Sequence, residues 1–113
     1  MNDREMLELG AKAAGFQWNP TISGSALYGC FETDVNQTTY AWNPFADDGD
    51  ALQLAAQLEI DITYKAFGED EVLVSASDDR FLGWFTVPYG NDKLAATRRA
   101  IMRAAAEIGK VVP

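Results

Sequence analysis

The sequence predicts an α+β fold, with a mainly antiparallel sheet of about five strands packed against three helices. Apolar residues recur with the 3.6-residue period of helices in some segments and alternate with the two-residue period of strands in others. Strand-like segments that are adjacent in sequence are joined by short turns, which favours antiparallel pairing. No linker, repeat or low-complexity tract interrupts the 113 residues, so we expect one sandwich domain over 1–113, in the order α-β-β-α-β-β-β-α.

The first helix is predicted from about residue 3 to residue 14. Asn2 or Asp3 can cap its first turn, and Gly15 suits the left-handed residue that often ends a helix. Its apolar residues form one stripe, which consists of Met6, Leu7, Ala11, Ala13 and Ala14. The next stretch, QWNPTISGS (17–25), contains a proline and a glycine and is predicted to be irregular.

The strands are predicted as one hairpin and one antiparallel meander. The hairpin comprises 26–32 and 38–42, and the meander comprises 60–64, 71–77 and 80–87. In the last of these segments, both alternating sets of side chains are apolar. This pattern predicts a central strand that is covered on both faces, either by helices or by a second copy of the chain.

The second helix is predicted over about 48–59, after a strand that Asn43 and Pro44 end, because proline cannot donate to a β-ladder. Leu52 lies at the edge of its buried face, which is formed by Ala51, Leu54, Ala55 and Leu58. The direct step from this helix to the next strand leaves no room for a long loop.

The third helix, about 92–109, has the clearest periodic pattern in the chain. Asn91 or Asp92 can cap it, and its many alanines favour helix and permit close packing. The apolar residues that recur every seven positions, and so predict the buried stripe, are Leu94, Ile101 and Ile108. Its other side carries the basic residues Arg99, Arg103 and Lys110.

Composition argues against several classes of function. The chain has no histidine and a single cysteine, Cys30, so it lacks the commonest general base and most transition-metal ligand sets. We expect Cys30 to be a buried apolar residue. The 17 acidic and 9 basic residues give a formal net charge of −8, which opposes binding to nucleic-acid phosphates. No apolar run could span a membrane and no signal peptide is recognisable, so we expect a cytoplasmic location.

The acidic stretch DDGD, residues 47–50, allows three interpretations: a metal or catalytic site, a helix start, or a surface for a partner. As a calcium loop it lacks the required spacing, because Gly49 comes too early and no glutamate follows at the right offset. As a helix start it has a direct mechanism. Asp47 can accept from the free amides of the first turn, and Asp50 can reach back as in a capping box. We favour the helix start.

Aromatic and basic residues also have two interpretations each. The aromatic residues lie mostly in predicted strands that contain little Lys or Arg, so we expect core packing and not stacking on bases. Arg98, Arg99 and Arg103 could bind phosphate or an acidic partner, although such a face more often pairs with nearby carboxylates. Neither a phosphate-binding glycine motif nor a catalytic motif is recognisable.

Three segments, MNDREMLELGAKAAG, WNPFADDGDALQLAAQL and ATRRAIMRAAAEIG, resemble small proteins encoded by phages and prophages. The group they resemble is the phage alpha-beta-alpha sandwich domain family, with the NinX-like phage proteins as broader kin. The shared features are a short N-terminal helix, an acidic helix start in mid-chain, and a closing alanine-rich helix with arginines. The resemblance covers about half of the chain. It implies an α/β sandwich and a phage origin, but no activity and no catalytic residues.

The sequence therefore favours a small phage or prophage accessory protein that binds another protein, or itself, and is not an enzyme. We expect no cofactor and no metal. Three alternatives stay open: an acidic inhibitor of a host defence or nucleic-acid enzyme that imitates DNA, a metal-dependent enzyme that uses 47–50, and a nucleic-acid binder that uses the arginines. The candidate partner surface consists of Trp42, Asn43, Asp47, Asp48, Asp50, Arg98, Arg99 and Arg103.

Overall fold

The computed structural model describes residues 2–19, 29–32, 39–65, 67–76 and 83–112. The described elements are, in chain order, α1 (Asp3–Ala14), β1 (Gln17–Asn19), β2 (Gly29–Glu32), β3 (Thr39–Trp42), α3 (Asp48–Leu58), β4 (Ile60–Tyr64), β5 (Glu71–Ala76), β6 (Trp84–Pro88) and α4 (Lys93–Val111). Within these ranges the α+β class and the antiparallel pairing are confirmed. None of the described helices is long and apolar enough to cross a membrane.

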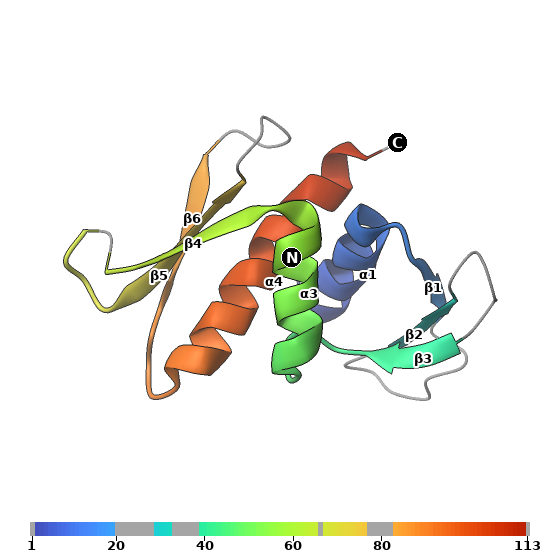
Figure 1. Cartoon of the computed structure of the whole chain (residues 1–113), viewed down its shortest axis with the longest axis horizontal. Coiled ribbons are helices and arrows are strands. Elements are labelled where there is room, and N and C mark those ends of the chain that lie inside the picture. Colours follow the sequence, from blue (N-terminus) through green and yellow to red (C-terminus); the bar gives the residue numbers. More distant parts are fainter. Residues whose placement is uncertain (1, 20–28, 33–38, 66, 77–82, 113) are drawn as a thin grey trace.

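The described strands form two three-stranded antiparallel sheets, β1-β2-β3 and β4-β5-β6, where the sequence predicts one sheet of about five strands. In the first sheet Gly29 lies opposite Trp42, and in the second Tyr64 lies opposite Val72. The additional strand, β1, lies in the stretch that is predicted to be irregular. Figure 1 shows the three helices between the two sheets, with β4-β5-β6 on the left and β1-β2-β3 on the right.

Several predictions concern residues outside the described ranges. These are the turns at 33–37 and 78–79 and residues 26–28, 38, 77 and 80–82 of the predicted strands. The predicted burial of Cys30 is likewise outside the description, because only the backbone of β2 is described at this position. The described parts of those strands, β2, β3, β5 and β6, lie within or close to their predicted ranges.

β6 is an edge strand, paired among the described strands with β5 alone. Among the described strands, β6 thus lies at an edge of its sheet and not at the central position that the sequence predicts. One face of this sheet packs on α4 and buries Val72 and Val74 completely. No described helix packs on the other face, where Trp84 is 55% exposed. The alternating apolar residues of this strand predict that both faces of the sheet are buried, but the pattern does not show which elements would pack on each face.

α4 lies at the centre of the core and is buried around most of its circumference, because α1, α3 and the β4-β5-β6 sheet all pack on it. Its closest neighbour is α1. A Cβ atom on Gly109 would overlap the backbone carbonyl group of Leu9, and one on Gly10 would lie 3.0 Å from the Cε atom of Met102. Glycine and alanine thus allow the two helix backbones to approach closely.

The helix ends agree with the local signals in the sequence. Asn2 caps α1 by accepting from the Glu5 amide at 2.8 Å, and Asp92 caps α4 by accepting from the Ala95 amide at 3.0 Å. Gly15 ends α1 in the left-handed conformation, with φ of 84°. α3 passes into β4 through a single left-handed residue, Glu59, which starts the second sheet directly beside the helix layer.

Candidate functional site

The structure separates the predicted partner surface into four places. Trp42 belongs to the core. A second group, which consists of Asn43, Asp47 and Asp50, holds the start of α3. Asp48 and Arg98 join α3 to α4. The remaining two, Arg99 and Arg103, face β6 and the start of α1 from another side of α4.

Trp42 is a core residue and not a surface residue. It is 4% exposed, and its ring packs edge-on against Phe16 with the ring centroids 5.8 Å apart. Pro44, two residues on, is also fully buried. The chain thus enters the helix layer at this point, and we remove Trp42 from the candidate surface.

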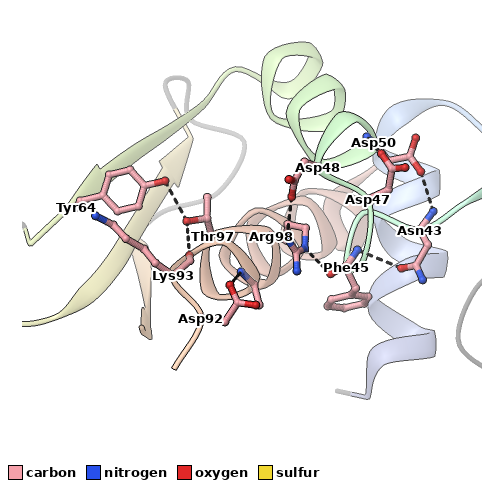
Figure 2. Close-up of polar contacts among 11 residues, drawn as sticks. Asn43, Phe45, Asp47, Asp48, Asp50, Tyr64, Asp92, Lys93, Thr97 and Arg98 are labelled. Carbon is pink, nitrogen blue, oxygen red and sulfur yellow. Dashed lines mark hydrogen bonds and ion pairs between the residues drawn. The ribbon is translucent and has the colours of Figure 1, made fainter. Parts of the chain in front are cut away.

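The acidic stretch 47–50 is confirmed as a helix start. Asp47 Oδ1 accepts from the Asp50 amide at 2.8 Å and caps α3. Asp50 does not reach back to the amide of Asp47, as a capping box requires. Its Oδ2 atom accepts instead from the Asn43 amide at 3.0 Å, and the Asn43 side chain accepts from the Phe45 amide at 3.1 Å (Figure 2). The carboxylates thus hold the bend between β3 and α3.

Partial burial of this bend raises the pKa of the Asp50 carboxyl above its ordinary value. The hydrogen bond from Asn43 lowers that pKa, and the negative charge of Asp47 raises it further. Among the described residues, no group of three His, Cys, Asp or Glu side chains is placed to hold a metal ion.

Asp48 and Arg98 link α3 to α4. Arg98 Nη1 donates to Asp48 Oδ1 at 2.7 Å, and Arg98 Nε donates to the carbonyl oxygen of Phe45, also at 2.7 Å (Figure 2). The Arg98 side chain is 17% exposed, whereas that of Asp48 is 66% exposed. Because Arg98 is held on two sides and largely covered, it has a structural role at the junction of the two helices.

Beside this pair, α3, β4 and α4 border an open groove of about 260 Å³. Its lining is mostly apolar, with Asp48 and Arg98 as its charged members. Three of the lining side chains are large and exposed: Leu52 by 67%, Leu94 by 60% and Tyr64 by 44%. We call this feature the Leu52–Leu94 groove.

Polar groups lie at the two ends of the Leu52–Leu94 groove. At one end, the Tyr64 hydroxyl and the Thr97 hydroxyl lie 3.0 Å apart, and Thr97 donates to the carbonyl oxygen of Lys93. Figure 2 shows the Tyr64 and Thr97 hydroxyls to the left of the Asp48–Arg98 pair. The groove can therefore receive apolar groups in its middle while polar groups bind at its ends.

Sequence reasoning missed this groove. Leu94 is predicted on the buried stripe of the last helix, together with Ile101 and Ile108, and only the latter two are buried. Leu94 stays exposed because it lies in the first turn of α4, N-terminal to the position where Arg98 meets α3. One feature of the sequence could have indicated the groove: Leu52 lies at the edge of the apolar face of its helix, where a large apolar side chain can stay exposed.

The arginines on the other side of α4 lie close to carboxylates, as the simpler interpretation predicts. Arg99 donates two hydrogen bonds of 3.2 Å to Asp3 at the start of α1. Arg103 Nε lies 3.4 Å from a carboxylate oxygen of Glu107, and its guanidinium carbon is 4.6 Å from the centroid of the Phe85 ring. A phosphate would have to compete with these carboxylates.

Comparisons with known proteins found no match for this chain among family models, curated proteins or solved structures. The resemblance to phage proteins stays a prediction. Function has to be inferred from the geometry described above.

Proposed function

We propose that this protein acts by binding another protein through the Leu52–Leu94 groove, as a phage or prophage accessory protein and not as an enzyme. One observation carries the proposal: α3, β4 and α4 each contribute a large exposed apolar side chain to one groove. Single exposed leucines are common on soluble proteins and need no explanation. Exposed apolar side chains that gather around a hollow are typical of interaction sites.

The shape of the groove suits an apolar anchor from a partner. Interfaces gain most of their affinity from a few apolar or aromatic side chains that fill pockets and are surrounded by a polar rim. Here Leu52, Leu94 and Ile62 form the apolar walls, and the Asp48–Arg98 pair with the Tyr64 hydroxyl forms the rim. By contrast, Asp47 and Asp50 are engaged in holding the start of α3, which weighs against an enzyme built on them.

The proposal is tested with the double variant Leu52→Gln/Leu94→Gln. Glutamine keeps length and helix propensity but removes the apolar surface. Affinity capture from the native host cell identifies the partner, and calorimetry then measures its affinity for both proteins. We expect the double variant to bind at least about tenfold more weakly, because truncation of anchor residues costs more than about 1 kcal/mol.

The control is Val111→Gln, which changes a side chain that is 61% exposed at the far end of α4. It should bind as the unmodified protein does. Equal affinity of the partner for the double variant and the unmodified protein would rule out the groove as the binding surface.

The DNA-mimicking inhibitor is a second candidate, because a net charge of −8 on this small chain favours it. The two candidates differ in their dependence on salt. Binding through an acidic surface weakens steeply as salt is added and survives the loss of Leu52 and Leu94. Binding through the apolar groove should depend only weakly on salt, and it should be lost when Leu52 and Leu94 are replaced.

A further inference from the structure

A trough runs along the edge of β6 that pairs with no described strand. Two hollows, of about 170 and 280 Å³, form it and share Val87 and Arg99. The first contacts the consecutive residues 85–87 and the second the consecutive residues 87–89. Because neighbouring strand residues point to opposite faces, a hollow that contacts three in a row lies along an edge of the strand. β5 occupies one edge, so the trough follows the other.

Backbone groups on this edge are available to an added strand. The Tyr89 amide donates to the carbonyl oxygen of Asp70, on the side of β5. Backbone groups alternate in direction along a strand, so those of Trp84, Thr86 and Pro88 point away from β5. Thr86 and Pro88 also line the trough. Pro88, which has no N–H to donate, is suited to this outer edge. Trp84 and Thr86 can therefore each offer both an N–H and a C=O group.

Arg103 offers hydrogen-bond donors to the same trough. Its Nε atom is buried and has no hydrogen-bond partner among the described residues, because Glu107 forms an ion pair with it at 3.4 Å without the geometry of a hydrogen bond. The guanidinium lies over the ring of Phe85, which fixes it beside the strand. Because the Arg103 side chain is 43% exposed as a whole, a ligand carboxylate would meet its terminal Nη groups and not the buried Nε atom.

Arg99 is the second cation of the trough. It is paired with Asp3, but both side chains are exposed, by 47% and 41%, and such pairs contribute little stability. An incoming carboxylate can therefore replace Asp3. Asp92, at the far end of the trough, is engaged in capping α4.

The spacing of the two arginines matches an extended peptide. Arg99 and Arg103 lie four residues apart on α4, which is about 6 Å along the axis. Side chains on one face of a strand recur every two residues, or about 6.6 Å. α4 returns along β6, since Arg103 lies over Phe85 and Arg99 lines the trough beside Val87 and Tyr89.

We propose that this trough binds an extended segment of a partner protein as an additional strand on β6, with acidic side chains at alternate positions that meet Arg99 and Arg103. A second copy of β6, with the sequence WFTVP, has no acidic side chain and lacks this complementarity. The site uses a different side of α4 from the Leu52–Leu94 groove and does not depend on the function proposed for that groove.

The test is an NMR titration of the isotope-labelled full chain with the peptide acetyl-TEVET-amide. We expect saturable shifts of the backbone amides of Trp84 and Thr86 and of the Arg103 Nε–H group. The matched peptide acetyl-TQVQT-amide should bind at least about tenfold more weakly, because its neutral amides cannot form ion pairs or bidentate carboxylate contacts with the arginines. The variant Arg103→Gln should lower the affinity for TEVET by at least about fivefold, and Leu52→Gln/Leu94→Gln should leave it unchanged.

Two N-methylated peptides test the strand pairing without any change to the protein. One is methylated on both glutamate amides and the other on the valine amide, and only one of these sets can face β6. One peptide should lose binding and the other should keep it. Equal affinities of the two, equal affinities of TEVET and TQVQT, or the absence of shifts at Trp84 and Thr86 would overturn the proposal. Concentration-dependent shifts of the same amides without peptide would assign the edge to a second copy and overturn it as well.

Discussion

The two long sides of α4 differ in the size of their contact residues and in how completely they are closed. Toward α1 the contact contains the small residues Gly10, Ala105 and Gly109, and Gly109 lies directly against the backbone of Leu9. Toward α3 and β4 the residues are large, and Leu52 and Leu94 stay exposed around a groove. The closed side should therefore contribute more to stability, whereas the exposed residues Leu52 and Leu94 of the open side can change with little effect on folding. Substitutions on the two sides separate these roles.

Of the substitutions that compare the two sides of α4, Gly109→Ala should have the largest effect on stability. The added Cβ atom would overlap the carbonyl group of Leu9, so α1 must shift away from α4. Alanine gains about 1 kcal/mol of helix propensity over glycine, which the overlap outweighs. We expect a net loss of about 3 kcal/mol in the free energy of unfolding, measured by urea denaturation.

Gly10→Ala is the matched control on the same contact. Its Cβ atom would meet the flexible end of Met102 at 3.0 Å, and this end can move. The gain in helix propensity then offsets most of the cost, and we expect a loss below about 1 kcal/mol. If Gly109→Ala were as stable as the unmodified protein, the closed side would not have the geometry described.

Arg98→Ala should have the next largest effect, because it opens the junction between α3 and α4. It leaves the carbonyl group of Phe45 and the carboxylate of Asp48 without their donors. We expect a loss of about 2 kcal/mol in the free energy of unfolding. Asp48→Ala should cost less than about 1 kcal/mol, because that side chain is mostly exposed. Equal losses for the two variants would show that the bond to Phe45 contributes nothing.

Leu52→Gln/Leu94→Gln should change stability by no more than about 0.5 kcal/mol for each substitution, because both side chains are exposed. Ile108→Ala, on the same helix but 1% exposed, should cost about 2–5 kcal/mol. Thermal unfolding of the variants checks this contrast. A large loss in the double variant would mean that the groove is part of the core and not a free surface.

Asp50→Asn should have the smallest effect, and its sign depends on pH. The pKa of Asp50 is raised in the folded chain, so the stability from its bound proton is fully present below the ordinary pKa of 3.8 and is lost as pH rises through the raised value. At neutral pH the charged carboxylate is then a small cost. Asparagine keeps an oxygen for the Asn43 amide and carries no charge.

We expect the difference in unfolding free energy between Asp50→Asn and the unmodified protein to move in favour of the variant by a few tenths of a kcal/mol from about pH 3.5 to pH 7. Urea denaturation at the two pH values measures it. A change in favour of the unmodified protein would show that the hydrogen bond from Asn43 outweighs the burial and the charge of Asp47.

Features that depend on near neighbours in sequence were predictable. The caps at Asn2, Asp47 and Asp92, and the end of α1 at Gly15, each involve residues at most four positions away. Their chemistry is therefore visible in the sequence, and the acidic stretch 47–50 could be identified as a helix start.

Features that depend on which elements meet in space were not predictable from the pattern. The heptad spacing of Leu94 indicates burial, but only the folded chain shows that the first turn of α4 is left uncovered. For Trp42 the sequence favours core packing, as for the other aromatic residues, but it also places Trp42 in the candidate partner surface. Only the folded chain shows that Trp42 is buried. The assignment of the strands to two sheets likewise depends on long-range pairing.

The central claim is that the open side of α4 is a binding surface, and site-specific photo-crosslinking tests it most directly. A benzophenone side chain replaces Leu94 in one protein and Val111 in a second, and each is irradiated in lysate of the native host cell. We predict one discrete covalent adduct from position 94 and none from position 111, with the adduct suppressed by excess unmodified protein but not by Leu52→Gln/Leu94→Gln. An adduct from position 111 alone, or equal suppression by both competitors, would contradict the claim.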